Sequence, residues 1–373
     1  MKKLFVLRHC CFFLRHYSFF LLIAASQMTS AQPQPKLAPC SQEELMTIKG
    51  KWVKSPEDHI ITGREHSFSE EQKKAMVLRM DQACRLIQAA WPDPKGMLVR
   101  TQRNMGYIVP GRSGMVGYSL SAGAFHYYCN PDLQHLGVDD ETDGSLAVHF
   151  NTFGGLLFYD TSMHVGHHYV ALMAPRVGRL KDADLYQTNP IRSDEQFVVI
   201  ARDGQFPLKM LTRKEYLTCL KGKLQREEAK GMGEEIKYAK TDQQKDQART
   251  YWQSHYDPKF KIIDDYLSHA SENDLDQTAF IKDLQNFTRF YTEAEGGRAP
   301  VINNADYFRP QQTPYFPQFI IVFWNWNDGE GPAGGLLRPR APDLNICCRI
   351  DKFFKESMEQ NLDVEAFRQM LDK

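Results

Sequence analysis

The hydrophobic pattern of this 373-residue chain changes near Met97, and that change constrains the fold more than any other feature. Between Val77 and Trp91, apolar residues recur at three- and four-residue steps, which is the stripe of an amphipathic helix. From Met97 to Leu211 the stripe disappears, and Gly, Tyr, Val and Phe dominate in the manner of β-strands. Separate blocks of helix and strand predict an α+β fold.

We predict an antiparallel sheet built from roughly residues 97–211 and completed by 318–326, with helices packed on it. The second segment (QFIIVFWNW) is an almost unbroken apolar run, which is typical of a buried central strand. Asp203-Gly204 favours a hairpin between strands 196–202 and 206–211, because a type I′ turn needs positive φ. Further strands are predicted over 118–129, 145–160 and 168–173.

Two capping boxes predict helix starts, Ser69 with Gln72 and Thr212 with Glu215. The charged segment 221–249 predicts a solvated helix that is broken around Gly231–Gly233. Further helices are predicted over 41–49, 251–267, 276–291, 350–359 and 363–371. We expect one domain over 41–373, and the alternative is a separate helical subdomain over 212–295.

Residues 1–31 have the pattern of a removable signal peptide. A basic start precedes the apolar run Tyr17–Ala25, and the small residues Thr29-Ser30-Ala31 stand before the expected cleavage point. An uncleaved anchor is the alternative. Residues 32–40 predict an extended leader, with lipidation at Cys40 as an alternative. Because no later segment reaches 18 apolar residues, we expect no transmembrane segment in the mature chain and a protein that is periplasmic or secreted.

Net charge bears on the kind of partner, and the cysteines bear on disulfides and zinc. Four of the 46 basic residues and none of the 46 acidic residues lie in 1–31, so the mature chain has a net charge of about −4. That balance argues against a nucleic-acid partner. An oxidising compartment permits disulfides, although buried free thiols fit as well, and the absence of CxxC argues against a zinc ribbon. The six remaining cysteines are Cys40, Cys84, Cys129, Cys219, Cys347 and Cys348.

A histidine cluster is the candidate metal site. On a single strand, His164 and His168 would share one face across Gly166, and His149 could join them from a neighbouring strand. Three imidazoles suit zinc, although no HExxH motif accompanies them. The alternative is a polar turn in water. No other residues can be nominated as catalytic.

Two further patterns have ordinary structural alternatives. Asp139–Gly144 has the spacing of a calcium loop, but Phe150 stands at the twelfth position, which favours an acidic turn. An aromatic set could line a sugar-binding groove, although core packing explains it better. Its members are Tyr307, Phe308, Tyr315, Phe316, Trp324 and Trp326.

Several segments resemble a group of exported proteins of Gram-negative bacteria, notably of the Bacteroidota. They are Phe206-Pro207, the block Thr212–Leu217, the leading Cys40 and the segment Tyr315–Ile320. That group has no assigned activity, so the resemblance implies a compartment and a fold but no catalytic residues. We favour a non-catalytic binding protein with a protein or glycan partner, and the alternative is a hydrolase that uses the histidine cluster.

Overall fold

The computed structural model describes residues 42–45, 47–55, 61–62, 68–108, 116–130, 135–139, 142, 144–166, 168–187, 195–202, 205–282, 288–308, 315–326 and 347–371. The predicted signal peptide and leader lie outside these residues. The chain divides into two units, Met1–Cys40 with Cys129–Gly137 and Ser41–Tyr128 with Val138–Lys373. The described part of the first unit, 129–130 and 135–137, is in strand conformation.

The larger sheet has the strand order β1-β3-β4-β6-β14-β11-β10-β9, and β2 also pairs with β3. Neighbours from β3 to β9 in this order are antiparallel. The predicted α+β class with an antiparallel sheet is confirmed. β1 and β2, which lie outside the segments predicted for that sheet, add parallel pairs with β3. The bounds are β1 Lys51–Lys54, β2 Ile61–Thr62, β3 Met97–Ile108, β4 Val116–Asn130, β5 His135–Val138, β6 Gly144–Phe150, β9 Arg176–Leu180, β10 Ala183–Gln187, β11 Glu195–Ile200 and β14 Ile320–Trp326.

Strand β14 is the central strand that its apolar sequence predicts. It is paired with β6 on one side and with β11 on the other. Because side chains alternate along a strand, Ile320 and Trp324 enter the core under the helices, while Ile321 enters the core beneath the second sheet. A strand buried on both faces has no polar face to present to water, which explains its unbroken apolar run.

The second sheet has the order β12-β13-β8-β7. Two expectations about the strands are wrong. Strands β11 and β12 lie in different sheets, so they do not form the predicted hairpin, and Asp203-Gly204 lies outside the described residues. The predicted strand 145–160 is interrupted because Asn151 has a φ of 58° and a short 3-10 helix follows at Gly154–Leu156. The bounds are β7 Leu157–Val165, β8 His168–Met173, β12 Leu208–Met210 and β13 Pro300–Asn303.

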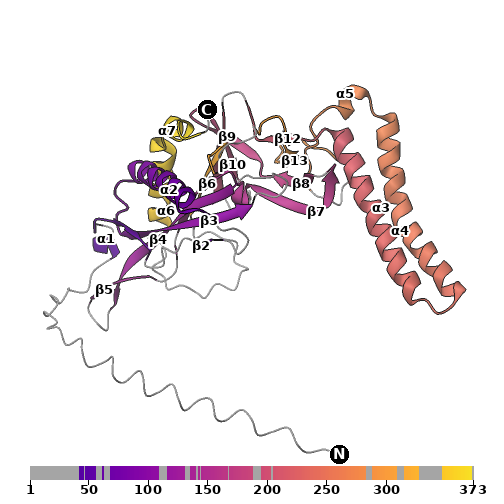
Figure 1. Ribbon diagram of the computed structural model, residues 1–373, viewed down its shortest axis with the longest axis horizontal. Coiled ribbons are helices and arrows are strands. Elements are labelled where there is room, and N and C mark those ends of the chain that lie inside the picture. The colour runs from indigo at the N-terminus through magenta and orange to yellow at the C-terminus, as the bar shows by residue number, and fades with distance from the viewer. Residues whose placement is uncertain are drawn as a thin grey trace, which may run out of the picture. The chain divides into compact units, whose positions relative to one another are not determined.

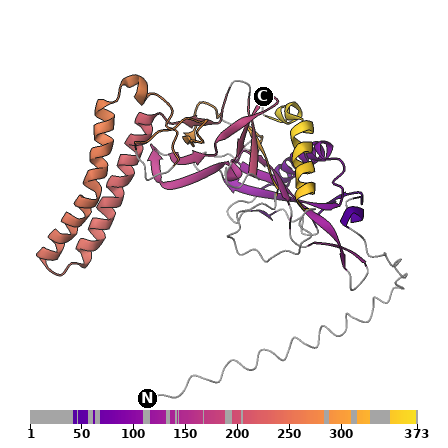
Figure 2. The ribbon, with the colours of Figure 1, turned by 180° about the vertical axis from the view of Figure 1, so that it is seen from behind.

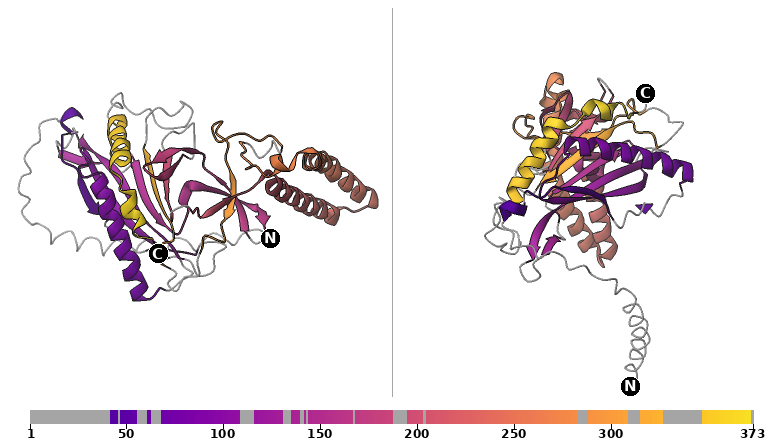
Figure 3. Two further views of the ribbon diagram at one scale, coloured as in Figure 1. Left: turned by 90° about the horizontal axis from the view of Figure 1, so that it is seen from above. Right: turned by 90° about the vertical axis from the view of Figure 1, so that its left-hand side faces the viewer.

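Helices α2, α6 and α7 cover one face of the larger sheet (Figures 1 and 3). The predicted capping box starts α2, since the Ser69 side chain accepts from the Gln72 amide and the Gln72 side chain accepts from the Ser69 amide. Met80 and Ile87 are fully buried on the inner face of α2, and Met358 is buried in the same core. The predicted C-terminal pair of helices is confirmed. The bounds are α1 Gln42–Leu45, α2 Glu70–Ala90, α6 Cys347–Asn361 and α7 Val364–Arg368.

A pair of long helices, α3 and α4, lies side by side (Figure 2) and shares a core with the second sheet. The Thr212 capping box starts α3 as predicted, but the expected break at Gly231–Gly233 is absent. The helix predicted over 276–291 is also wrong, because Thr278 and Ile281 form isolated β-bridges instead. Among the described residues, no helix has both the length and the apolar character needed to cross a membrane. The bounds are α3 Arg213–Tyr238, α4 Asp242–His269 and α5 Glu272–Leu275.

Candidate functional site

The three histidines predicted as metal ligands are not brought together. His164 is the next-to-last residue of β7 and pairs with Tyr169, whereas His168 starts β8 and pairs with Val165. Directly paired residues share a face and successive residues alternate, so His164 and His168 point to opposite faces of a hairpin. The single strand on which the zinc hypothesis depended is therefore wrong. Within the described residues, no three His, Cys, Asp or Glu side chains form a metal-binding group, and His167 lies outside them.

His149 lies in the other sheet, on β6, between Ser119 of β4 and Ile321 of β14. Its ring packs so closely on Gly154 that an added Cβ there would lie 2.7 Å from Nε2. Burial lowers the pKa of His149 to about 4, because the charged imidazolium would lose its hydration. His149 is therefore a neutral packing residue at physiological pH.

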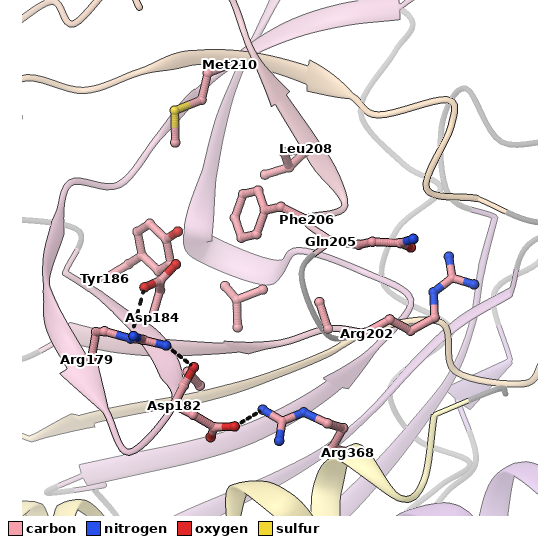
Figure 4. A pocket seen from close by; sticks show the side chains of 13 residues that line it. Arg179, Asp182, Asp184, Tyr186, Arg202, Gln205, Phe206, Leu208, Met210 and Arg368 are labelled. Atoms are coloured by element: carbon pink, nitrogen blue, oxygen red, sulfur yellow. Dashed lines mark hydrogen bonds and ion pairs between the residues drawn. The ribbon is translucent and has the colours of Figure 1, made fainter.

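A cavity of about 640 Å³ lies where the larger sheet faces β12 (Figure 4). Strands β9, β10 and β11 supply one wall, the segment that leads into β12 supplies another, and α7 contributes one side chain. The lining residues are Arg179, Asp182, Ala183, Asp184, Tyr186, Val199, Ala201, Arg202, Gln205, Phe206, Leu208, Met210 and Arg368.

Ion pairs occupy one side of this cavity. Arg179 Nε lies 3.8 Å from Asp184 Oδ1, and Arg179 Nη2 donates to the Asp182 carbonyl at 2.6 Å. Arg368 Nη2 lies 2.6 Å from Asp182 Oδ2 (Figure 4). Both carboxylates of the lining are therefore held by arginines.

Apolar and aromatic side chains form the middle of the cavity. The rings of Tyr186 and Phe206 stack with centroids 6.2 Å apart, and Leu208 and Met210 stand beside them (Figure 4). Burial raises the pKa of Tyr186 above its usual value, so its hydroxyl stays protonated. The middle of the cavity is thus uncharged.

Arg202 and Gln205 lie across the cavity from the ion pairs (Figure 4). The Arg202 guanidinium lies 4.5 Å from the centroid of the Tyr307 ring, and its Nη2 donates to the Tyr307 carbonyl. Arg202 Nε is buried and has no hydrogen-bond partner among the described residues. The side chain of Gln205 is exposed.

The sequence did not identify this cavity. Its residues come from segments near 180, near 205 and at 368, and each segment by itself is ordinary strand or helix. The resemblance singled out Phe206 alone among the lining residues. The charged residues of the short turn between β9 and β10 are the one sequence feature that could have pointed to this cavity.

The aromatic set, the cysteines and the acidic turn were the other candidates from the sequence. Tyr307 and Trp324 are almost completely buried, as core packing predicts. Cys84 is a free thiol whose pKa is raised by burial, and the Cys219 thiol donates to the His164 carbonyl at 3.0 Å. The side chains of Cys40, Cys129, Cys347 and Cys348 lie outside those described, as do Asp140, Glu141 and Asp143 of the acidic turn, so their pairing and role stay predictions.

Comparisons of the chain with protein-family models, curated proteins and solved structures give no match.

Proposed function

We propose that this protein is a non-catalytic binding protein that acts outside the cytoplasm and holds a small molecule in the cavity between the larger sheet and β12. The cavity itself carries the proposal. Its volume of about 640 Å³ falls in the range of small-molecule sites, which measure roughly 300–1,000 Å³. An apolar middle with polar groups at its two sides is the usual composition of such a site.

Binding fits the chemistry of the lining better than the hydrolase alternative. A hydrolytic site needs a nucleophile or a base within reach of a substrate. Here Asp182 and Asp184 are engaged by arginines, and the lining contains no histidine or cysteine among the described residues. Those carboxylates are held as counter-charges rather than as free bases. The pattern of residues 1–31 supports the compartment.

Filling the cavity tests this proposal. Ala201 lines the cavity, so Ala201→Trp should occupy its middle, whereas Ala229→Trp adds the same side chain to an exposed position on α3. We expect the neutral dye Nile red to bind the wild type and Ala229→Trp with saturable fluorescence enhancement, and Ala201→Trp to lose that enhancement. Unchanged dye binding by Ala201→Trp, with circular dichroism showing a folded protein, would rule out this cavity as the binding site.

A further inference from the structure

Charge is balanced on one side of the cavity and unbalanced on the other. Arg179 and Arg368 each have an aspartate within ion-pair distance. Among the described residues, Arg202 has no carboxylate within that distance, and its guanidinium contacts Tyr307, a neutral residue. A partly buried guanidinium without a counter-charge is costly, because it loses hydration and gains no opposite charge in return.

The hydrogen bonding of Arg202 is incomplete as well. Its Nη2 donates to the Tyr307 carbonyl, but the buried Nε donates to nothing among the described residues. A buried donor without an acceptor costs free energy that an incoming acceptor can restore. An acceptor that carries a negative charge would relieve both deficits at once, after the flexible side chain turns from the Tyr307 carbonyl.

The surroundings of Arg202 indicate which anion fits. One guanidinium offers two parallel N–H groups, which matches a single carboxylate. The exposed Gln205 amide stands on the same side and can contribute a further donor (Figure 4). Across the cavity, Arg179 and Arg368 are already paired with Asp184 and Asp182, so no second arginine of the lining is free to balance a second negative charge. A monoanion whose body is apolar therefore suits this cavity better than a dianion such as a phosphate monoester.

We propose that the ligand of the cavity is a small monocarboxylate with an apolar or aromatic body. Its carboxylate is bound by Arg202, with Gln205 beside it. Its body lies against Phe206, Leu208 and Met210. This inference rests on the proposed binding function, and it adds the chemical class of the ligand and the residue that selects it.

Calorimetry of the purified protein with matched ligands tests the inference. The probes are octanoate, 3-phenylpropanoate and indole-3-acetate, each compared with its own primary amide at pH 7.5. The amide keeps the shape and removes the charge. We expect the carboxylates to bind at least about tenfold more tightly than their amides, because a charge-assisted bidentate contact is stronger than a neutral one.

Variants identify the residue responsible. Arg202→Gln should reduce carboxylate binding to the level of the amide while the amide still binds, which shows that the cavity is intact. Arg179→Gln is the matched control, because that arginine is already paired and its loss should leave the carboxylate preference in place. Should Arg202→Gln fail to fold, Arg202→Lys keeps the charge beside Tyr307 and should lose most of the preference with the bidentate geometry.

The outcomes separate the two proposals. If no carboxylate or amide binds the wild type at millimolar concentration, both the binding function and this inference are overturned. Equal binding of acids and amides overturns the ligand class and leaves the binding function standing. A carboxylate preference that persists in Arg202→Gln shows that another group selects the anion, and overturns the role of Arg202.

Discussion

Two glycines of α3, two residues apart, are predicted to respond oppositely to the same substitution. At Gly231 an added Cβ would lie 2.1 Å from Cη2 and 2.3 Å from Cζ2 of Trp252 on α4. At Gly233 an added Cβ would meet no atom within 4 Å. Both lie inside the same helix, so the intrinsic helix preference of alanine over glycine applies equally to both.

The magnitudes follow from these contacts. Gly233→Ala should stabilise the helix by up to about 1 kcal/mol, which is the difference in helix propensity. Gly231→Ala gains the same amount but forces α3 and α4 apart by more than about 1 Å to restore ordinary contact, and such overpacking costs about 1–3 kcal/mol. Trp252 cannot simply turn away, because its ring stacks on Tyr256 with centroids 5.8 Å apart and meets Tyr251 edge-on. The two variants should therefore differ in stability by about 1–3 kcal/mol.

Hydrogen exchange read by mass spectrometry is the suitable assay, because the part of α3 beyond Leu224 has no buried residue and can open separately from the rest. Amides of 225–255 should exchange faster than wild type in Gly231→Ala and more slowly in Gly233→Ala. If Gly231→Ala protects these amides as much as Gly233→Ala does, the close approach of α3 to Trp252 is refuted.

Three further predictions concern the framework. Asn151→Ala should lower the free energy of unfolding in urea by about 3 kcal/mol or more, because this fully buried side chain makes three hydrogen bonds to backbone groups. The depressed pKa of His149 means that the unfolded chain takes up a proton first as pH falls, so stability is complete above about pH 6.5 and declines toward pH 4. His149→Gln should flatten that decline in urea titrations, and an unchanged slope would contradict the burial of the ring. Asp274→Asn, which removes the counter-charge of Arg213, should cost about 1–2 kcal/mol and speed exchange at the base of α3, unlike Asp265→Asn on the exposed side of α4.

Features determined by neighbouring residues were predictable from the sequence. Ser69 and Thr212 cap their helices because the reciprocal bonds of a capping box span only three residues. The segment Ile320–Trp326 was identifiable as a central strand, since burial on both faces leaves an apolar run.

Features that depend on distant partners were not predictable. A glycine such as Gly231 is typical of a helix break, but α3 continues through it. The glycine is there because Trp252 of α4 lies so close that a larger side chain would not fit. The segment around Asp203-Gly204 has the local chemistry of a hairpin turn. The chain nevertheless passes there from one sheet to another, because β11 pairs with β14 and β12 pairs with β13. The local preference of two residues for a turn contributes less than the pairing of whole strands with partners that come more than 90 residues later in the chain.

The two candidate sites differ in the same way. The histidine cluster was conspicuous because its members are close in sequence, yet the antiparallel pairing of β7 with β8 places His164 and His168 on opposite faces. In the cavity, the three arginines look alike in the sequence. The position of two aspartates distinguishes them. Asp184 and Asp182 lie beside Arg179 and Arg368, whereas Arg202 lies across the cavity from both aspartates. Selectivity for an anion would then arise because, within the described part of the chain, no carboxylate lies within ion-pair distance of Arg202. That property belongs to the assembled site and to no single segment of it.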